Sequence, residues 1–341
     1  MTSTAPVFVV GTPRSGTTLT SRVLRRHSRL FAGGAADFFE DIYARRGAIA
    51  DPRTDLGARE EVIERLRTLY HRRSGGQSQE RIDRLFTRTD LLDRLRRAPG
   101  YAELFATFVA SQAQDAGKPR WVNHVPKDVF HLDDVFALFP DARIVICARH
   151  VLDFLVSYRD QFRRAQRRAA PANADRLRKL YHPIGTSILW RASVRVALDA
   201  IARWPARVML NRYEDLVSDP ARQVARLCAF VGEAFEPDML RVDMNNSSRA
   251  VDAQGIFVSS VGQWRSALSE TEAWLALTLC GDAVRRLGYA VEPVRPRWSE
   301  VGGWAGTLPV YAISAMRANA DRRGPNMRYL ARRLAALARA K

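Results

Sequence analysis

A glycine-containing loop near the N-terminus holds the first residues that could perform chemistry. Residues 11–18 read GTPRSGTT, between a β-branched apolar run at Val7–Val10 and a helical stretch from about Leu19 to His27. A strand, a glycine loop and a helix in this order gather backbone N–H groups and a helix N-terminus around one anion. The spacing of the two glycines is that of phosphate-binding loops. We therefore expect an anion site here.

The loop departs from those of nucleoside triphosphate enzymes at one position. Where such enzymes place a lysine on the β- and γ-phosphates, this chain has Thr17, followed by Thr18. The fixed positive group is instead Arg14, inside the loop. A buried strand predicted at Arg143–Ala148 is followed by Arg149, where a metal-binding aspartate would be expected. An anion site with arginines and no metal fits a phosphosulfate better than a nucleoside triphosphate.

Strands and helices that alternate along the chain must position these residues. Strands are predicted at Val7–Val10, Trp121–Asn123, Arg143–Ala148 and Arg207–Leu210. Helices are predicted at Glu60–Tyr70, Gln79–Arg97, Tyr101–Asp115 and Pro220–Val231, with another from about Val151. This alternation predicts an α/β fold with a central, mostly parallel sheet flanked by helices.

Composition narrows the class of protein. The 341 residues allow one large α/β domain or two domains, and a hydrophobic fraction of 47% excludes wholesale disorder. A net charge of +18 favours an anionic partner, such as nucleic acid, anionic lipid or a phosphorylated or sulfated small molecule. A compositional bias toward arginine is the alternative explanation for that charge.

Cysteine usage and the N-terminal sequence bear on the compartment. Three scattered cysteines, Cys147, Cys228 and Cys280, form neither a disulfide framework nor a thiolate metal site. The N-terminus lacks the basic region of a secretory signal. No run reaches the ~18 apolar residues of a transmembrane helix. We expect a cytoplasmic protein without a transmembrane segment.

Four segments, in order, resemble sulfotransferases that use 3′-phosphoadenosine-5′-phosphosulfate (PAPS). VFVVGTPRSGTTLTSRVL resembles their 5′-phosphosulfate-binding segment, and FPDARIVICARHVLDFLVSY resembles their 3′-phosphate-binding segment. LNRYEDLVSDPARQVARLCAFVG resembles the YEDL segment, and FVSSVGQWRSAL the late loop of bacterial and tyrosylprotein-type members. The resemblance covers about residues 6–289. It implies a phosphate-binding-loop sulfotransferase fold with PAPS as sulfuryl donor and no metal.

The resemblance assigns binding roles to individual residues. The loop members Arg14, Ser15, Gly16, Thr17 and Thr18 would bind the 5′-phosphosulfate, with Arg14 also able to hold the sulfuryl oxygens. Arg149 and Ser157 would grip the 3′-phosphate, Tyr213 would lie on or near adenine, and Glu214 and Asp215 would anchor loops. Ser260, Gly262, Trp264 and Arg265 would lie near the nucleotide. The alternatives are an Arg149–Asp153 surface ion pair, a structural Ser157 and a core Trp264.

Two kinds of side chain are candidates for the base that takes the acceptor's proton. His124 resembles the catalytic histidine of cytosolic sulfotransferases, and an imidazole pKa near ~6.5 suits this role; Val122 replaces a lysine of that segment. Other members use a glutamate whose position here is Gly34. Asp37 and Glu40 therefore stay as alternative bases, unless they are ordinary first-turn charges of a helix.

The chain divides into a sulfotransferase domain, residues 1–290, and a basic, partly helical tail, residues 291–341. A helical segment at about 37–115 would cover the acceptor site. Apolar residues recur at helical spacing in the tail: Met327, Leu330, Leu334 and Leu337. We favour packing of this stretch on its own domain or on a second subunit, as in a homodimer. Peripheral contact with an anionic membrane is the alternative.

The expected reaction is sulfation of a hydroxyl on a small molecule, glycan, lipid, peptide or secondary metabolite. A nucleotide-dependent kinase is the rival enzyme, and Thr17 at the lysine position argues against it. A basic nucleic-acid-binding protein would use the arginine-rich stretch Arg159–Lys179 and the tail. The chain lacks a helix-turn-helix, zinc or aromatic RNA-binding pattern, so no nucleic-acid partner is expected. The same stretch could instead steer an acidic acceptor.

Overall fold

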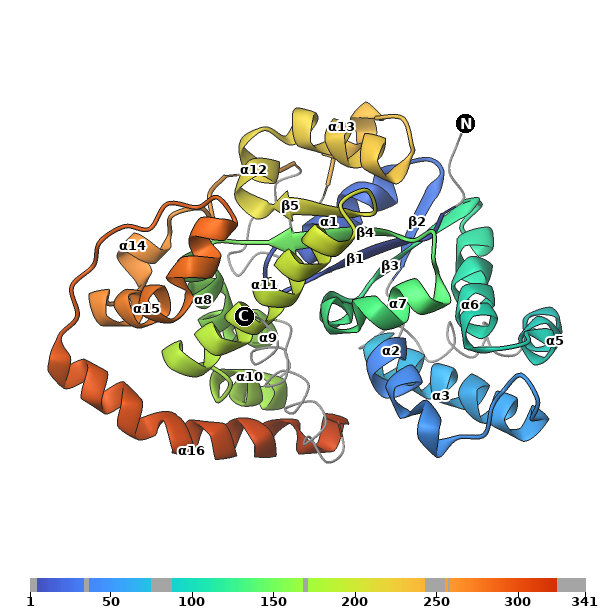
Figure 1. The fold of residues 1–341 in the computed structure, drawn as a ribbon, viewed down its shortest axis with the longest axis horizontal. Coiled ribbons are helices and arrows are strands. Elements are labelled where there is room, and N and C mark those ends of the chain that lie inside the picture. Colours follow the sequence, from blue (N-terminus) through green and yellow to red (C-terminus); the bar gives the residue numbers. More distant parts are fainter. Residues whose placement is uncertain are drawn as a thin grey trace.

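The computed structural model describes residues 5–33, 37–74, 88–167, 171–242, 255–256 and 258–323 (Figure 1). The strands are β1 (Val7–Gly11), β2 (Leu30–Gly33), β3 (Arg120–His124), β4 (Arg143–Ala148) and β5 (Val208–Arg212). The helices are α1 (Thr17–Arg26), α2 (Phe38–Asp41), α3 (Leu56–Ser74), α5 (Thr89–Arg97), α6 (Tyr101–Asp115), α7 (Leu132–Leu138), α8 (Val151–Arg159), α9 (Gln161–Arg167), α10 (Pro171–Arg178), α11 (Pro183–Arg203), α12 (Tyr213–Ser218), α13 (Pro220–Val231), α14 (Trp264–Ala267), α15 (Glu270–Arg286) and α16 (Trp298–Arg323). Short 3₁₀ helices are η1 (Tyr43–Ala48), η2 (Pro126–His131) and η3 (Pro237–Leu240).

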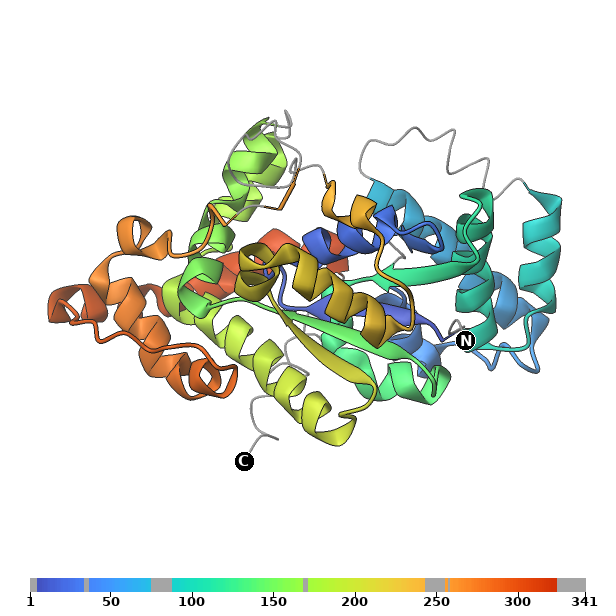
Figure 2. The ribbon, with the colours of Figure 1, turned by 90° about the horizontal axis from the view of Figure 1, so that it is seen from above.

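The described strands form one parallel sheet in the order β2-β3-β1-β4-β5. All five residues of β1 are buried, because helices cover both faces of the sheet (Figures 1 and 2). Val7 and Val9 pack on the side of α1 and α13, whereas Phe8 and Val10 pack on the side of α6, α7 and α11. An apolar strand buried on both faces is typical of parallel sheets. The predicted α/β fold is confirmed.

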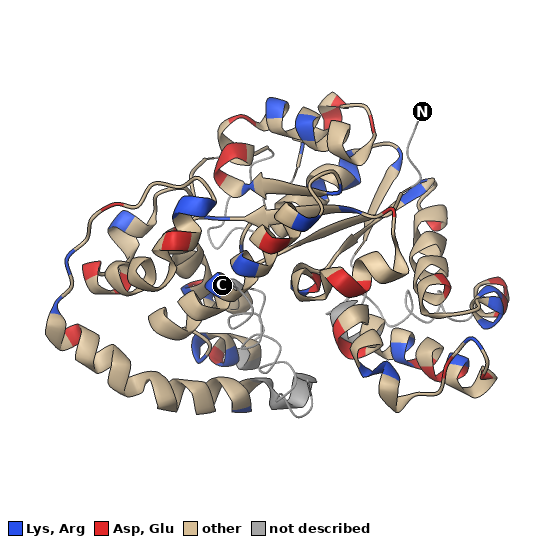
Figure 3. Ribbon diagram, in the orientation of Figure 1, with Lys and Arg blue, Asp and Glu red and all other residues tan. Residues whose placement is uncertain are grey.

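A third cluster of apolar side chains joins the later helices. Phe154 of α8, Trp190 of α11 and Ala276 of α15 belong to it. Helix α16 packs on α11 and α15 along the outer edge of the molecule (Figure 1), and residues 301–316 carry no charged side chain (Figure 3). Among the described helices, α16 included, none is both long and apolar enough to span a membrane.

The structure differs from the predicted elements in a few places. The edge strand β2 was not predicted, because Leu-Phe-Ala-Gly is short and has no β-branched residue. The helix considered for residues 37–46 is a single turn, α2, followed by the 3₁₀ helix η1. The helix predicted at 79–97 is described only as α5, and the tail stretch 327–341 lies outside the described residues.

The strand order brings distant residues to one edge of the sheet. After β1 the chain crosses to β2 and returns to β3, and it then enters β4 on the other side of β1. Ligands of open parallel sheets bind where the order reverses in this way, at the carboxyl ends of the strands. The register pairs Val9 with His124 and Gly11 with Cys147. His124, the glycine loop and Arg149 therefore meet at this edge.

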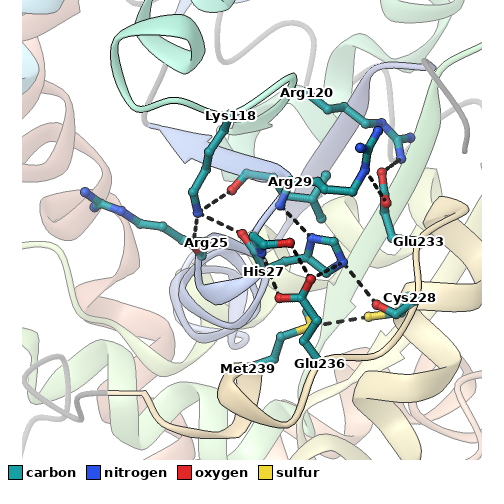
Figure 4. Close-up of polar contacts among 12 residues, drawn as sticks. Arg25, His27, Arg29, Lys118, Arg120, Cys228, Glu233, Glu236 and Met239 are labelled. Atoms are coloured by element: carbon teal, nitrogen blue, oxygen red, sulfur yellow. Dashed lines mark hydrogen bonds and ion pairs between the residues drawn. The ribbon is translucent and has the colours of Figure 1, made fainter.

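The opposite end of β3 carries a buried ion pair (Figure 4). Arg120 Nη1 lies 3.1 Å from Glu233 Oε1, with both side chains almost fully buried. Arg29 Nε donates to the second oxygen of Glu233, also at 3.1 Å. Arg120 further donates to the carbonyl groups of Ala5 and Val231. These contacts connect the amino ends of β1 and β3 to the end of α13 and the segment that follows it.

We predict that Glu233→Gln lowers the free energy of unfolding by about 3 kcal/mol, because it leaves the buried Arg120 charge without its counter-charge. Urea unfolding followed by circular dichroism measures the change. Glu64→Gln is the matched control, since Glu64 is exposed and lies 3.6 Å from Arg67. It should cost less than about 1 kcal/mol. Equal losses in the two variants would contradict the stabilising role of the buried pair.

Candidate functional site

The glycine loop adopts a backbone shape that few side chains tolerate. Gly11 has φ 135°, and a Cβ there would lie 2.2 Å from the Cys147 carbonyl oxygen. Gly16 has φ 89°, and a Cβ there would lie 2.8 Å from Cδ2 of Tyr213. Arg14 has φ 73°, and no other described non-glycine residue has positive φ. Strain of this kind concentrates at functional sites.

Arg14 is half-buried and contacts α8. Its Nε donates to Ser157 Oγ at 3.1 Å. Burial, together with the nearby charge of Arg149, lowers the pKa of Arg14 to about 10. The guanidinium therefore stays charged at neutral pH, but next to a second cation that destabilises it.

Arg149 follows β4 and is 7% exposed. Its Nη2 donates to the Ser260 carbonyl at 2.5 Å, and its guanidinium lies 4.5 Å from the centre of the Tyr213 ring. The Tyr213 hydroxyl lies 2.5 Å from Ser260 Oγ, and Trp190 Nε1 donates to the Arg149 carbonyl. In the part of the chain that the structure describes, neither Arg149 nor Arg14 forms an ion pair with a carboxylate.

Several buried polar atoms of this site have no hydrogen-bond partner among the described residues. They include Ser15 Oγ and Arg149 Nε. Thr17 is buried and Thr18 half-buried at the start of α1, where Gly16 provides no side-chain cap. Buried donors without acceptors are rare in folded proteins. Two guanidinium groups, hydroxyl groups and helix N-terminal amides together fit an anion with more than one phosphate or sulfate group.

Asp153 holds the late loop against α8. Its carboxylate accepts the backbone N–H of Gly262 at 2.7 Å and that of Trp264 at 3.1 Å. It does not form the ion pair with Arg149 that the sequence left open. Ser260, Gly262 and Trp264 thus lie close to Arg149 and α8, whereas Arg265 is exposed and pairs with Glu292.

The YEDL segment fixes neighbouring loops, as expected for its acidic residues. Glu214 accepts the backbone N–H of His150 at 2.9 Å and the hydroxyl of Tyr289 at 2.7 Å. Asp215 pairs with Arg212 at 2.7 Å. These contacts hold the turn that carries Arg149.

The three candidate bases lie in different surroundings. His124 ends β3, paired with Val9 and half-buried beside the loop. Asp37 accepts from Lys127 Nζ at 3.2 Å. Glu40 lies 3.0 Å from Nε2 of His131, whose side chain is 1% exposed. Both carboxylates therefore already have a charged or chargeable partner.

Sequence reasoning named Asp153 only as an ion-pair partner of Arg149 and missed its bonds to the backbone of the late loop. It missed Lys127 altogether. Lys127 lies three residues after His124, but its contact with Asp37 crosses 90 residues of sequence. No sequence pattern identifies such a contact. No group of three or more His, Cys, Asp or Glu residues suited to a metal occurs among the described residues.

We predict that His131 stabilises the fold at acidic and neutral pH. Burial alone would lower its pKa, but hydrogen bonds with Asp134 and Glu40 raise it above the ordinary value. A raised pKa in the folded state adds stability that is full below the unfolded pKa of about 6.5 and is lost as pH rises through the folded pKa. The unfolding free energy of wild type should therefore fall more between pH 6 and pH 9 than that of His131→Asn, measured by urea titration. Parallel pH curves would contradict the assignment.

Comparisons with known proteins agree with this geometry. The model of the family described as "Sulfotransferase family" matches residues 6–237. The chain is 25% identical over 301 residues to nodulation protein NoeE of Sinorhizobium fredii, covering 83% of this chain and 65% of that protein. It is 24% identical over 279 residues to an uncharacterized protein of Aquifex aeolicus, covering 77% of this chain and 31% of that one. The chain thus spans just under two thirds of the Sinorhizobium fredii protein and about a third of the Aquifex aeolicus protein.

Solved structures give a similar result. The sulfotransferase domain from the curacin biosynthetic pathway matches with a TM-score of 0.55 and 18% identity, covering 86% of this chain and all of that one. The sulfotransferase domain from the Synechococcus PCC 7002 olefin synthase has a TM-score of 0.49 and 20% identity, covering 86% of this chain and 98% of that one. At this identity the first match shows a shared fold.

Proposed function

The chain belongs to the sulfotransferase family, and we propose that it transfers a sulfuryl group from PAPS to a hydroxyl of an acceptor. One observation carries this proposal. Arg14 and Arg149 lie near each other at the carboxyl ends of β1 and β4, without a carboxylate partner in the described structure, beside buried donors that lack acceptors. PAPS presents two separate anionic groups that such donors can hold.

The residues fit the two ends of this donor molecule. Loop amides and the side chains of Ser15, Thr17 and Thr18 would hold the 5′-phosphosulfate, with Arg14 on its oxygens. Arg149 and Ser157 would hold the 3′-phosphate. Tyr213 would lie near adenine. Ser260, Gly262, Trp264 and Arg265 would border the nucleotide; the exposed position of Arg265 suits closure over a bound ligand.

The protein's contribution to transfer is positioning and charge stabilisation. PAPS supplies the activated sulfuryl group, which passes to an acceptor oxygen in line with the leaving phosphate oxygen. The loop amides and Arg14 stabilise the charge that develops on the leaving side. They are held in place by the parallel sheet and by Ser157, so little reorganisation is needed at the moment of reaction.

We propose His124 as the base that takes the acceptor proton. It lies at the end of β3, next to the strand that leads into the loop. Asp37 already pairs with Lys127, and Glu40 already contacts His131, so both carboxylates are engaged within the protein. We also propose that the chain divides into a transfer domain, residues 1–290, and a tail, residues 291–341, that includes α16. His124, Asp37 and Glu40 lie in the transfer domain, whose helical segment at 37–115 would cover the acceptor.

The acceptor would be a hydroxyl of a carbohydrate, lipid, peptide or secondary metabolite. A screen of such compounds with labelled PAPS, read by a mass gain of one SO₃, identifies its class. This assay also tests the proposed function as a whole, because a kinase would not transfer the labelled SO₃ group from PAPS to the acceptor.

We predict that adenosine 3′,5′-bisphosphate (PAP), the desulfated product of PAPS, raises Tm without Mg²⁺, since it binds the folded state. Arg149→Ala should weaken PAP binding at least about tenfold, the scale of one charged hydrogen bond. Thermal shift and calorimetric titration measure these effects. Arg203→Ala, which removes an exposed arginine paired with Asp133, should leave binding unchanged. Equal, Mg²⁺-dependent stabilisation by ATP would contradict the proposal and favour a kinase.

We predict that His124→Ala lowers turnover by about 10²–10⁴ while PAP affinity stays nearly intact, because a general base acts on the acceptor and not on the nucleotide. Steady-state sulfation with an acceptor found in the screen gives turnover, and titration gives affinity. Asp37→Asn and Glu40→Gln are the comparison variants, with a much smaller expected loss. Wild-type turnover in His124→Ala would move the base to one of these carboxylates.

A further inference from the structure

Two side chains of helix α8 hold the late loop, residues 258–267, through hydrogen bonds to its backbone. Asp153 accepts two backbone N–H groups of this late loop, from Gly262 and Trp264. Arg159 Nη1, near the other end of α8, donates to the Ala267 carbonyl at 2.7 Å. The two side chains therefore hold residues 262–267 at both ends.

Both oxygens of the Asp153 carboxylate accept hydrogen bonds from this loop. Asp153 is 2% exposed, and each oxygen accepts one N–H, so the buried charge is satisfied by the loop backbone. No cation pairs with it among the described residues. Hydrogen bonds to an ionised acceptor are roughly twice as strong as neutral ones. The loop is thus fixed by a group that would be costly to leave unbonded.

The loop in turn holds the arginine assigned to the 3′-phosphate. The Ser260 carbonyl accepts from Arg149 Nη2, and Ser260 Oγ lies 2.5 Å from the Tyr213 hydroxyl. Tyr213 also lies under the Arg149 guanidinium. A chain of contacts therefore runs from Asp153 through Gly262 and Ser260 to Arg149. The late loop lies beyond residues 6–237, which the family model matches.

We propose that Asp153 is a positioning residue for the nucleotide: it fixes the late loop, so that Ser260 and Tyr213 hold Arg149 ready for the 3′-phosphate. This inference rests on the proposed function. A loop ordered before binding removes part of the conformational entropy that the ligand would otherwise have to overcome. Loss of Asp153 should therefore weaken nucleotide binding more than it slows transfer once the nucleotide is bound.

The test compares Asp153→Asn with wild type. An asparagine keeps the size of the side chain, but its NH₂ group replaces one carboxylate oxygen and cannot accept the N–H that this oxygen accepted. The Kd for PAP and the KM for PAPS should rise about tenfold, with kcat at saturating PAPS within about threefold. In hydrogen exchange read by mass spectrometry, the peptide spanning 258–268 should exchange faster without ligand and regain protection with PAP.

Asp219→Asn is the matched control. Asp219 also accepts a backbone N–H at a helix start, that of Arg222, but it lies at α13, away from the late loop. It should change neither PAP affinity nor exchange at 258–268. If Asp153→Asn does not fold, Tyr213→Phe tests the link to Arg149, and it should raise the KM for PAPS with little change in kcat.

Two outcomes would overturn the inference. Faster exchange of the loop with unchanged PAP affinity would mean that the loop does not position the nucleotide site. A fall in kcat with unchanged KM for PAPS would place Asp153 in the transfer step instead. If wild type itself does not bind PAP, the proposed function fails and this inference with it, a result distinct from binding by wild type that Asp153→Asn retains in full.

Discussion

The candidate site depends on two guanidinium groups that the fold holds near each other without a carboxylate partner among the described residues. Arg14 and Arg149 come from different strand ends, and the pKa of Arg14 is lowered by burial and by Arg149. A flexible surface would let such groups separate or pair with acids. Here a strained loop backbone fixes one arginine, while Trp190 and the YEDL segment fix the turn that bears the other.

The two ends of the sheet place arginine side chains in different electrostatic surroundings. At the amino end of β3, Arg120 is buried with Glu233 and with carbonyl groups, so its charge is neutralised within the protein. At the carboxyl ends of β1 and β4 the partners of the arginines among the described residues are neutral: Ser157, Ser260 and Tyr213. One end of the sheet thus neutralises its arginine with a carboxylate, and the other does not.

Local pattern was enough to predict the loop with Arg14 and the parallel strands around it, since each rests on residues adjacent in sequence. The binding role of Arg149 came from the family resemblance and stays a prediction. The edge strand β2 escaped notice because its residues have weak strand preference and its partner β3 lies 90 residues away. The contacts of Asp37 with Lys127 and of Glu40 with His131 cross similar distances. Sequence could name these carboxylates as candidates, but only the packing of α2 on η2 shows what they touch. Asp153 was noticed only as a partner for Arg149, and its actual partners are backbone groups that no residue pattern reveals.

The pKa of Arg14 is about 10, so this guanidinium does not change its charge near neutral pH. Between about pH 6 and pH 8 the two guanidinium groups keep their charge, so they add no pH dependence to the binding of an anionic donor. The 3′-phosphate of PAPS itself titrates at about pH 6, so the pH dependence of donor binding would come from the ligand. When PAPS is saturating, its binding no longer limits the rate. A pH–rate profile then reports on the group that takes the proton of the acceptor hydroxyl.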